Sequence, residues 1–305
     1  MQPKSVTVRV PAKINLQLGV GPLRADGYHE LVTVFHAINI CDDVIAEATA
    51  PGAGISLEMV GEASVAVDGT NLAWRAAQAL ADASGVDPDV HLQIHKRIPV
   101  AGGMAGGSAD AAAALVACDA LWRLSTERAE LARLAATLGS DVPFALHGGT
   151  AIGTGRGEQL TDVLARGTLH WVVAIADEGL STPAVYAECD RLRAGDDVSD
   201  PVVSEVLMQG LRSADAQAVG RALTNDLQPA ALSLRPELGQ VLQAGDDLGA
   251  LGGIVSGSGP SLAFIVADEE RALDLAVGLM STGMVRSVKR AHGPVPGARV
   301  VNEGW

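Results

Sequence analysis

The sequence predicts an α+β protein of two domains, because stretches with the periodicity of strands and of helices are mixed along the whole chain. These stretches neither alternate strictly nor separate into a strand part and a helix part. A length of 305 residues accommodates one large or two ordinary domains, and 48% of the residues are hydrophobic. The glycine-rich stretch Gly148 to Gly157 is the expected passage between the domains. We therefore expect one domain over residues 1–158 and another over residues 159–305.

In the first half, alternation of apolar and polar residues predicts strands, and apolar residues every three or four positions predict helices. Val6, Val8 and Val10, for example, alternate with polar side chains. The expected strands span 6–10, 31–40, 55–60 and 90–94, and the expected helices span 71–83, 108–122 and 126–138.

In the second half, the expected elements are a strand over 171–176, helices up to about residue 250, a strand over 261–266 and a helix over 269–279. The uncharged run Leu248 to Ala267 has the length of a membrane span. It carries five glycines, three serines and Pro260, however, so it is expected to form a strand, a turn and a strand.

Charge and cysteine content limit the possible partners. The formal net charge of −14 opposes binding to nucleic acid or to an anionic membrane, so neither is expected as a partner. The three cysteines are far apart and form no C-x-x-C pair, and the N-terminal segment lacks the apolar core of a signal peptide. We expect a cytoplasmic protein with a small-molecule partner and no metal site built from protein ligands alone.

A glycine-rich loop between an expected strand and an expected helix is the first sign of chemistry. Its sequence is PVAGGMAGGSAD, residues 99–110. Backbone N–H groups in such a loop, together with a helix start, can cradle phosphates, although a flexible turn explains the glycines equally well. The loop lacks the lysine of a Walker A motif and the G-x-G-x-x-G spacing of a dinucleotide site.

Three motifs in order carry a resemblance to a known superfamily. They are VPAKINL at residues 10–16, the glycine-rich loop, and GIVSGSGPS at residues 253–261. In this order they resemble the superfamily of galactokinase, homoserine kinase and mevalonate kinase. The resemblance implies a two-domain small-molecule kinase fold with its active site in the cleft between the domains. It also implies that residues 1–158 bind ATP and carry the catalytic groups, whereas residues 159–305 bind the substrate.

Further segments narrow the resemblance to one family. They are RADGYHEL at 24–31, NLAWRAA at 71–77, HKRIPVAGG at 95–103 and LGSDVPFALHGG at 138–149. Together they resemble the 4-diphosphocytidyl-2-C-methyl-D-erythritol kinases, which act in the non-mevalonate route to isoprenoid precursors. The resemblance implies transfer of the ATP γ-phosphoryl group to the 2-hydroxyl of that substrate. ATP is then the co-substrate, accompanied by Mg²⁺ that phosphates and water mostly hold.

The resemblance also assigns roles in phosphoryl transfer, which depends on positioning and on charge stabilisation. Asp141 matches the catalytic aspartate that accepts the proton of the hydroxyl, and Lys13 matches the catalytic lysine. Asn15 matches a neighbour that contacts the substrate. From the residues alone, the favoured interpretation of Asp141 is a helix N-cap, and that of Lys13 is a solvated lysine at a strand end.

The chain's only two tyrosines, Tyr28 and Tyr186, are expected to hold a flat group. Tyr28 stands beside Gly27 and His29 in a polar turn, which needs the glycine but not the ring. The resemblance implies that both tyrosines stack on the cytosine and that His29 hydrogen-bonds its edge. The alternative for either tyrosine is simple cover of apolar surface.

On the ATP side, the resemblance implies a phosphate-binding loop with neighbours at the nucleotide. The residues concerned are Asn71, Lys96, Pro99, Gly102, Gly103, Gly106, Gly107 and Ser108. Asn71 by itself is an expected N-cap of the helix that it opens. In the third motif, Gly257 and Ser258 are expected to approach the active site, although a tight turn explains them too.

Three alanines depart from the family's usual loop. Ala101 and Ala105 stand where many members have glycine, and Ala109 where many have a second serine. The Cβ of Ala105 is expected to disfavour a positive φ and to reshape the cradle slightly. Three alternatives to the family stay open: another kinase of the superfamily, a catalytically silent small-molecule sensor, and a nucleic-acid-binding protein. The DGYH segment counts against another kinase of the superfamily. The presence of Lys13 and Asp141 counts against a silent sensor, and the net charge counts against a nucleic-acid-binding protein.

Overall fold

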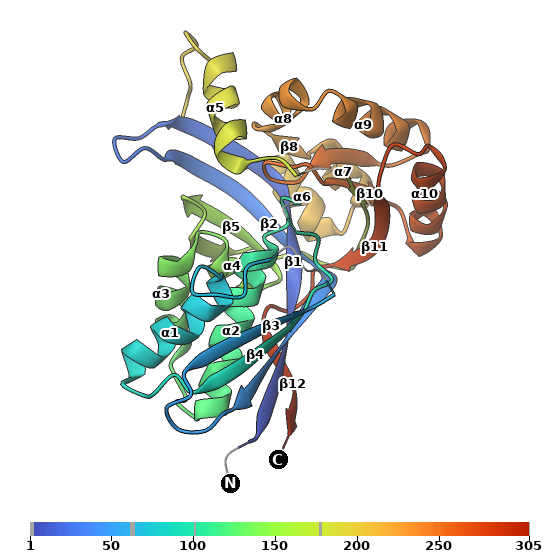
Figure 1. Ribbon diagram of the computed structural model, residues 1–305. Helices are drawn as coiled ribbons and strands as arrows, with labels where there is room; N and C mark the ends of the chain where they lie inside the picture. The colour runs from blue at the N-terminus through green and yellow to red at the C-terminus, as the bar shows by residue number, and fades with distance from the viewer. Residues whose placement is uncertain (1–2, 62–64, 101, 177–178, 305) are drawn as a thin grey trace.

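The computed structural model describes residues 3–61, 65–100, 102–176 and 179–304, and it contains two sheets with helices packed against them (Figure 1). The strands are β1 Ser5–Leu23, β2 His29–Ala48, β3 Ile55–Val60, β4 Val90–His95, β5 Thr150–Gly155, β6 Gln159–Asp162, β7 Leu169–Ile175, β8 Thr224–Asn225, β9 Gly252–Val255, β10 Leu262–Val266, β11 Ser287–Gly293 and β12 Arg299–Gly304. The helices are α1 Leu72–Ser84, α2 Gly106–Trp122, α3 Arg128–Leu138, α4 Val142–His147, α5 Thr182–Leu192, α6 Glu205–Ser213, α7 Ala216–Arg221, α8 Gln228–Leu234, α9 Glu237–Asp247 and α10 Glu269–Ser281.

The first sheet is built around the long antiparallel pair β1 and β2. Its described strands follow the order β12-β1-β2-β4-β3, while β5 pairs with another part of β2 and β6 with β5. Helices α1 to α4 lie on one face (Figure 1). The alanines of α2, such as Ala111 to Ala114, are fully buried, because small side chains let this helix approach the sheet closely. Ile14 and Leu16 of β1 belong to the same core.

The second sheet is smaller, antiparallel throughout, and has the order β11-β7-β10-β9. Strand β10 reads LAFIV and is buried along its whole length, as expected for a central strand covered on both faces. Leu18 and Val20, near the distal end of β1, pack into this second core as well. The long hairpin therefore reaches both sheets (Figure 1).

Local patterns predicted most of the regular elements. The expected strand 55–60 is confirmed as β3, and the expected helices at 71–83, 108–122 and 126–138 are confirmed as α1, α2 and α3 with small shifts at their ends. The run from Leu248 to Ala267 forms β9, a turn and β10, as expected. Among the residues that the structure describes, no helix is long and apolar enough to cross a membrane.

The stretch Gly148 to Gly157, expected as the passage between the domains, is not an open linker. Residues 150–155 of this stretch form β5, which pairs with residues 31–36 of β2 and thus continues the first sheet. Strand β6 adds to β5, and β12 returns from the end of the chain to pair with β1. The first sheet therefore takes strands from both sides of the expected boundary at residue 158. Long-range pairing decides this, and a glycine-rich sequence does not reveal it.

Candidate active site

A cavity of about 980 Å³ opens where the glycine-rich loop and the β1–β2 hairpin meet α5 and the turn between β9 and β10. All the site residues predicted from the sequence line it, except Asn71. They are Lys13, Asn15, Tyr28, His29, Lys96, Pro99, Gly102, Gly103, Gly106, Gly107, Ser108, Asp141, Tyr186, Gly257 and Ser258. Segments from both halves of the sequence thus build one wall.

The glycine-rich loop packs tightly against the turn at residues 256–259. A Cβ on Gly103 would lie 2.1 Å from the carbonyl oxygen of Ser256, so no side chain fits there. The hydroxyl of Ser256 also donates a hydrogen bond of 3.2 Å to the carbonyl oxygen of Gly103. This close approach explains the glycine at position 103, while positive φ values of 57° and 79° favour glycine at positions 257 and 259.

Ala105 adopts a left-handed conformation, with φ 57° and ψ 36°, directly before the first residue of α2. The loop adopts this positive φ although the Cβ of Ala105 disfavours it. An L-residue in this region costs about 1–2 kcal/mol, so the loop carries local backbone strain at this position. Gly106 to Ser108, at the start of α2, follow directly and line the cavity. Ala101, the other alanine in the loop's first turn, lies outside the described residues.

Lys96 is held beneath the start of α2 by two buried carboxylates. Its Nζ lies 2.5 Å from Asp42 Oδ2 and 2.7 Å from Asp110 Oδ2. Burial opposes the charge of Lys96, but the two carboxylates outweigh it and raise the pKa of the ammonium. Burial, reinforced by Asp42, raises the pKa of Asp110 to about 8 against the pull of Lys96. The Nζ also lies 3.2 Å from the position that a Cβ on Gly106 would take, which brings this charge to the phosphate loop.

Lys13, Asn15 and Asp141 form the polar centre of the cavity. Lys13 Nζ donates a hydrogen bond of 2.8 Å to Asn15 Oδ1 and lies 3.7 Å from Asp141 Oδ2. Asn15 Nδ2 in turn donates to Thr33 Oγ1 at 2.8 Å. Lys13 is buried, with 9% of its side chain exposed, whereas a third of the Asp141 side chain reaches the cavity surface. The lysine is thus fixed, and the carboxylate stays open to a ligand.

The backbone explains how these side chains are aimed. Register shifts between Pro11 and Ala12 and between Asn15 and Gln17 flank the segment in the β1–β2 pair. Irregularities of this kind re-aim side chains and often lie beside active sites. Asp141 precedes α4, but its carboxylate makes no capping hydrogen bond in the described structure. The simple interpretation of Asp141 as a side-chain N-cap therefore has no support.

His29 and the two tyrosines line the far end of the cavity. The rings of His29 and Tyr186 stack with centroids 5.5 Å apart and an angle of 24° between planes. Tyr28 is 53% exposed, and the guanidinium of Arg156 lies 5.0 Å from its ring centroid. Burial and the nearby charge of Asp141 raise the pKa of the Tyr186 phenol. The described ring contacts of the tyrosines are therefore with His29 and Arg156, and a slot between Tyr28 and Tyr186 stays a prediction.

Asn71 acts in the structure as a helix cap. Its Oδ1 accepts the N–H of Ala73 at 2.8 Å, and its Nδ2 donates to the carbonyl oxygen of Ala66 at 2.7 Å. It is buried, and its neighbour Leu72 lines the cavity in its place. Asn71 is therefore the N-cap of α1, which is the structural alternative that the sequence suggested for it.

Several polar residues of the site were not predicted from the sequence. They are Thr33, Asp42, Asp110, Arg156 and Asp190. Asp190 was the easiest of them to predict, since it follows Tyr186 by four residues and so shares its face of α5. Its carboxylate lies 3.3 Å from His29 Nε2, while His29 Nδ1 lies 2.8 Å from the carbonyl oxygen of Gly21. Asp42 and Arg156 reach the site only through sheet pairing and had no local signal.

The fold is that of a small-molecule kinase, and two family models match the chain. Residues 71–149 match the GHMP kinases N terminal domain, and residues 207–281 match the GHMP kinases C terminal domain. In fold, the chain is similar to homoserine kinase from Cytophaga hutchinsonii, with a TM-score of 0.76 at 18% identity over 98% of both chains.

Closer relatives identify the family. The chain is 56% identical to 4-diphosphocytidyl-2-C-methyl-D-erythritol kinase of Thermobifida fusca, over 98% of this chain and 99% of the relative. It is also 56% identical to the enzyme of that name from Mycolicibacterium smegmatis, over 97% and 92%. A crystal structure of 4-(cytidine 5'-diphospho)-2C-methyl-D-erythritol kinase superimposes with a TM-score of 0.77 at 32% identity, over 93% of this chain and 98% of that one.

The chain therefore belongs to the 4-diphosphocytidyl-2-C-methyl-D-erythritol kinase family. Its members are named as kinases, so the protein is an ATP-dependent phosphotransferase with a small-molecule substrate. The predicted fold class and the predicted family are confirmed.

Proposed function

We propose that the protein transfers the γ-phosphoryl group of ATP to the 2-hydroxyl of 4-diphosphocytidyl-2-C-methyl-D-erythritol, a step in isoprenoid precursor synthesis by the non-mevalonate route. The observation that carries this proposal is the arrangement of Lys13, Asn15 and Asp141 between the glycine-rich loop and the cluster of Tyr28, His29 and Tyr186. One cavity thus offers the glycine-rich loop to a phosphate donor and the cluster of aromatic rings to an aromatic group of the substrate.

In the proposed reaction, Asp141 accepts the proton of the attacking hydroxyl. Lys13, 3.7 Å away, stabilises charge on the migrating phosphoryl group. Asn15 holds the ammonium of Lys13 in place through its hydrogen bond of 2.8 Å and contacts the substrate near the reacting hydroxyl. Such a site works mainly by positioning and electrostatics.

The loop is proposed to bind the ATP phosphates through the backbone N–H groups of Gly102, Gly103, Gly106 and Gly107 and the hydroxyl of Ser108. Mg²⁺ is expected with the nucleotide. This cation is proposed to be held mostly by phosphates and water. Lys96 supplies fixed positive charge below the loop.

The two halves are proposed to divide the work, with residues 1–158 binding ATP and residues 159–305 contributing to the substrate site. Tyr186 and Asp190 come from the second half, whereas Tyr28 and His29 come from the first, so the substrate site draws on both. We also propose a reducing cytoplasm as the compartment, because Cys41, Cys118 and Cys189 are all free thiols.

One assay tests the proposal: ATP consumption with the cytidylylated methylerythritol, run beside homoserine and mevalonate. Turnover of the cytidine compound alone is the expected result. Phosphorylation of homoserine or mevalonate in its place would overturn the substrate assignment, and the absence of turnover with all three would favour a catalytically silent sensor.

A further inference from the structure

A second cavity, of about 650 Å³, shares no lining residue with the active-site cavity and is strongly basic. Of its twelve lining residues, five are Lys or Arg and none is Asp or Glu. The whole chain has only 22 Lys and Arg among 305 residues, against 36 Asp and Glu. Positive charge is thus concentrated in one hollow of an otherwise acidic protein.

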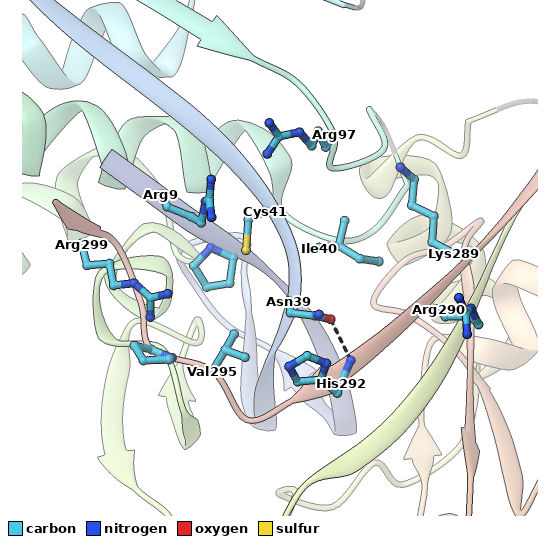
Figure 2. Close-up of a pocket in the computed structure, with 12 residues that line it drawn as sticks. Arg9, Asn39, Ile40, Cys41, Arg97, Lys289, Arg290, His292, Val295 and Arg299 are labelled. Carbon is cyan, nitrogen blue, oxygen red and sulfur yellow. Dashed lines mark hydrogen bonds between the residues drawn. The ribbon is translucent and has the colours of Figure 1, made fainter. Parts of the chain in front are cut away.

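The basic residues come from segments far apart in the sequence. Figure 2 shows Arg9 of β1 and Arg299 of β12 on one side of this basic cavity, Lys289 and Arg290 of β11 on the other, and Arg97 between them. Apolar side chains, among them those of Ile40 and Val295, complete the wall. These basic residues form no local motif in the sequence, and only the tertiary fold brings them together.

Two features describe the electrostatic surroundings of these cations. Arg9 and Arg299 are directly opposite each other in the antiparallel β1–β12 pair, where like charges are unfavourable. Asp43 binds both Arg9, at 2.7 Å, and Arg97, at 3.0 Å, so one carboxylate serves two guanidinium groups. An anion in the cavity would relieve the repulsion that remains.

Lys289 and Arg299 have no such partner. Within the ranges that the structure describes, no carboxylate oxygen lies within 4.0 Å of their charged nitrogens. Arg290 is 4.0 Å from Glu269 on α10, the limit of an ion pair. Five cations line the cavity, and Asp43 and Glu269 are the two carboxylates beside them, so an excess of about three positive charges remains. A ligand with several negative charges would balance this excess better than one with a single carboxylate.

We propose that this basic cavity binds a small molecule that carries a diphosphate or a longer polyphosphate group. Guanidinium groups match phosphate oxygens with two parallel hydrogen bonds, and a lysine adds a point charge. The volume is in the range of small-molecule sites, and the apolar residues leave room for an organic part. The net charge of −14 opposes a long polyanion, so a compact ligand fits better than nucleic acid.

The test is calorimetric titration of inorganic diphosphate into the full-length protein saturated with a non-hydrolysable ATP analogue. The analogue fills the phosphate loop, so that site cannot account for the signal. One further site is expected, with an affinity that falls as salt is raised from about 50 to 200 mM, because exposed charges are screened. No binding under these conditions would overturn the proposal.

The double variant Lys289→Ala/Arg299→Ala removes two cations that lie outside the active-site cavity. Diphosphate affinity should fall at least about 10-fold, since each charge-assisted hydrogen bond is strong, while kinase turnover at saturating substrates stays at the parent level and reports an intact fold. The control Arg212→Ala/Arg271→Ala removes the same charge from exposed positions on α6 and α10 and should keep the affinity. Equal losses in both double variants would mean that net charge, and no specific site, attracts diphosphate.

Two ligand arms separate the possible sources of the phosphate group. A short alkyl diphosphate that binds more tightly than inorganic diphosphate supports an organic ligand lying along Ile40 and Val295. Equal affinity supports inorganic di- or polyphosphate. With either ligand, the Lys289→Ala/Arg299→Ala variant must bind more weakly than the parent. An unchanged affinity in that variant refutes the site.

Discussion

The Nζ of Lys13 lies 3.7 Å from a carboxylate oxygen of Asp141, although the two residues belong to a strand and a helix start 128 positions apart. The lysine is buried and held by Asn15, and the aspartate is partly open to the cavity. This asymmetry suits a fixed cation that serves a carboxylate in contact with the substrate.

Asp141→Asn keeps the size of the side chain and removes its charge. Turnover should fall by roughly 100-fold or more, the scale of a lost acid–base group, while ATP binding survives. Steady-state kinetics together with nucleotide titration check this. Asp82→Asn, on the exposed side of α1, is the matched control and should behave as the parent. Near-normal turnover of Asp141→Asn would assign this residue a structural role only.

Gly106→Val places a branched side chain beside Ile98 and the Nζ of Lys96, both 3.2 Å from the position that a Cβ on this glycine would take. The KM for ATP should rise, because the backbone there is proposed to approach phosphate. The KM for the cytidine substrate should change little. Gly239→Ala on α9, whose Cβ would meet no atom within 4 Å, serves as the control. Loss of both affinities together would indicate misfolding.

Tyr28→Ala and Tyr186→Ala should each raise the KM for the cytidine substrate by roughly 5- to 150-fold, since stacking on a base contributes about 1–3 kcal/mol. The KM for ATP should barely move. The Tyr→Phe variants are the controls and keep the ring. Titration with a cytidine nucleotide checks the effect directly. If both alanine variants bind it as tightly as the parent, the aromatic slot does not exist.

Ala105→Gly should stabilise the protein by about 0.5–1 kcal/mol. The substitution relieves the cost of about 1–2 kcal/mol for an L-residue at φ 57°, and the greater freedom of glycine in the unfolded chain offsets part of this gain. Urea unfolding measures the difference. Ala83→Gly, in the last turn of α1 where φ is helical, should be destabilising instead.

His36 should make stability depend on pH. It is fully buried, and burial lowers its pKa to about 3, against about 6.5 in an unfolded chain. Between these values the unfolded chain binds a proton that the folded protein does not. Stability is therefore fully present above pH 6.5 and falls as pH drops below it, by up to about 1.4 kcal/mol per pH unit.

Urea unfolding of the parent and of His36→Gln at pH 7.5, 6.0 and 5.0 checks this effect. The variant should lose less stability over the interval than the parent does. His91→Gln, which changes a partly exposed histidine on β4, should keep the parent's dependence. Identical slopes for the parent and His36→Gln would show that His36 does not titrate as its burial implies.

Elements with local signals could be predicted from the sequence alone. The alternation in β3 and β4, the apolar face and Asn71 cap of α1, and the glycines before α2 were all readable, because neighbours in the chain decide them. The sequence also identified the family, and all but one of the site residues predicted from its motifs line the active-site cavity.

The pairing of strands that are distant in the sequence could not be predicted in this way. Gly148 to Gly157 looked like a linker and became a strand of the first sheet, because β2 offered it a partner more than 100 residues away. The same kind of pairing brought Asp42 to Lys96 and set Arg299 opposite Arg9. Strand pairing joins backbone groups and depends on three-dimensional register, so no local pattern indicates it. For that reason the buried charge cluster below the phosphate loop and the basic cavity were visible only in the folded protein.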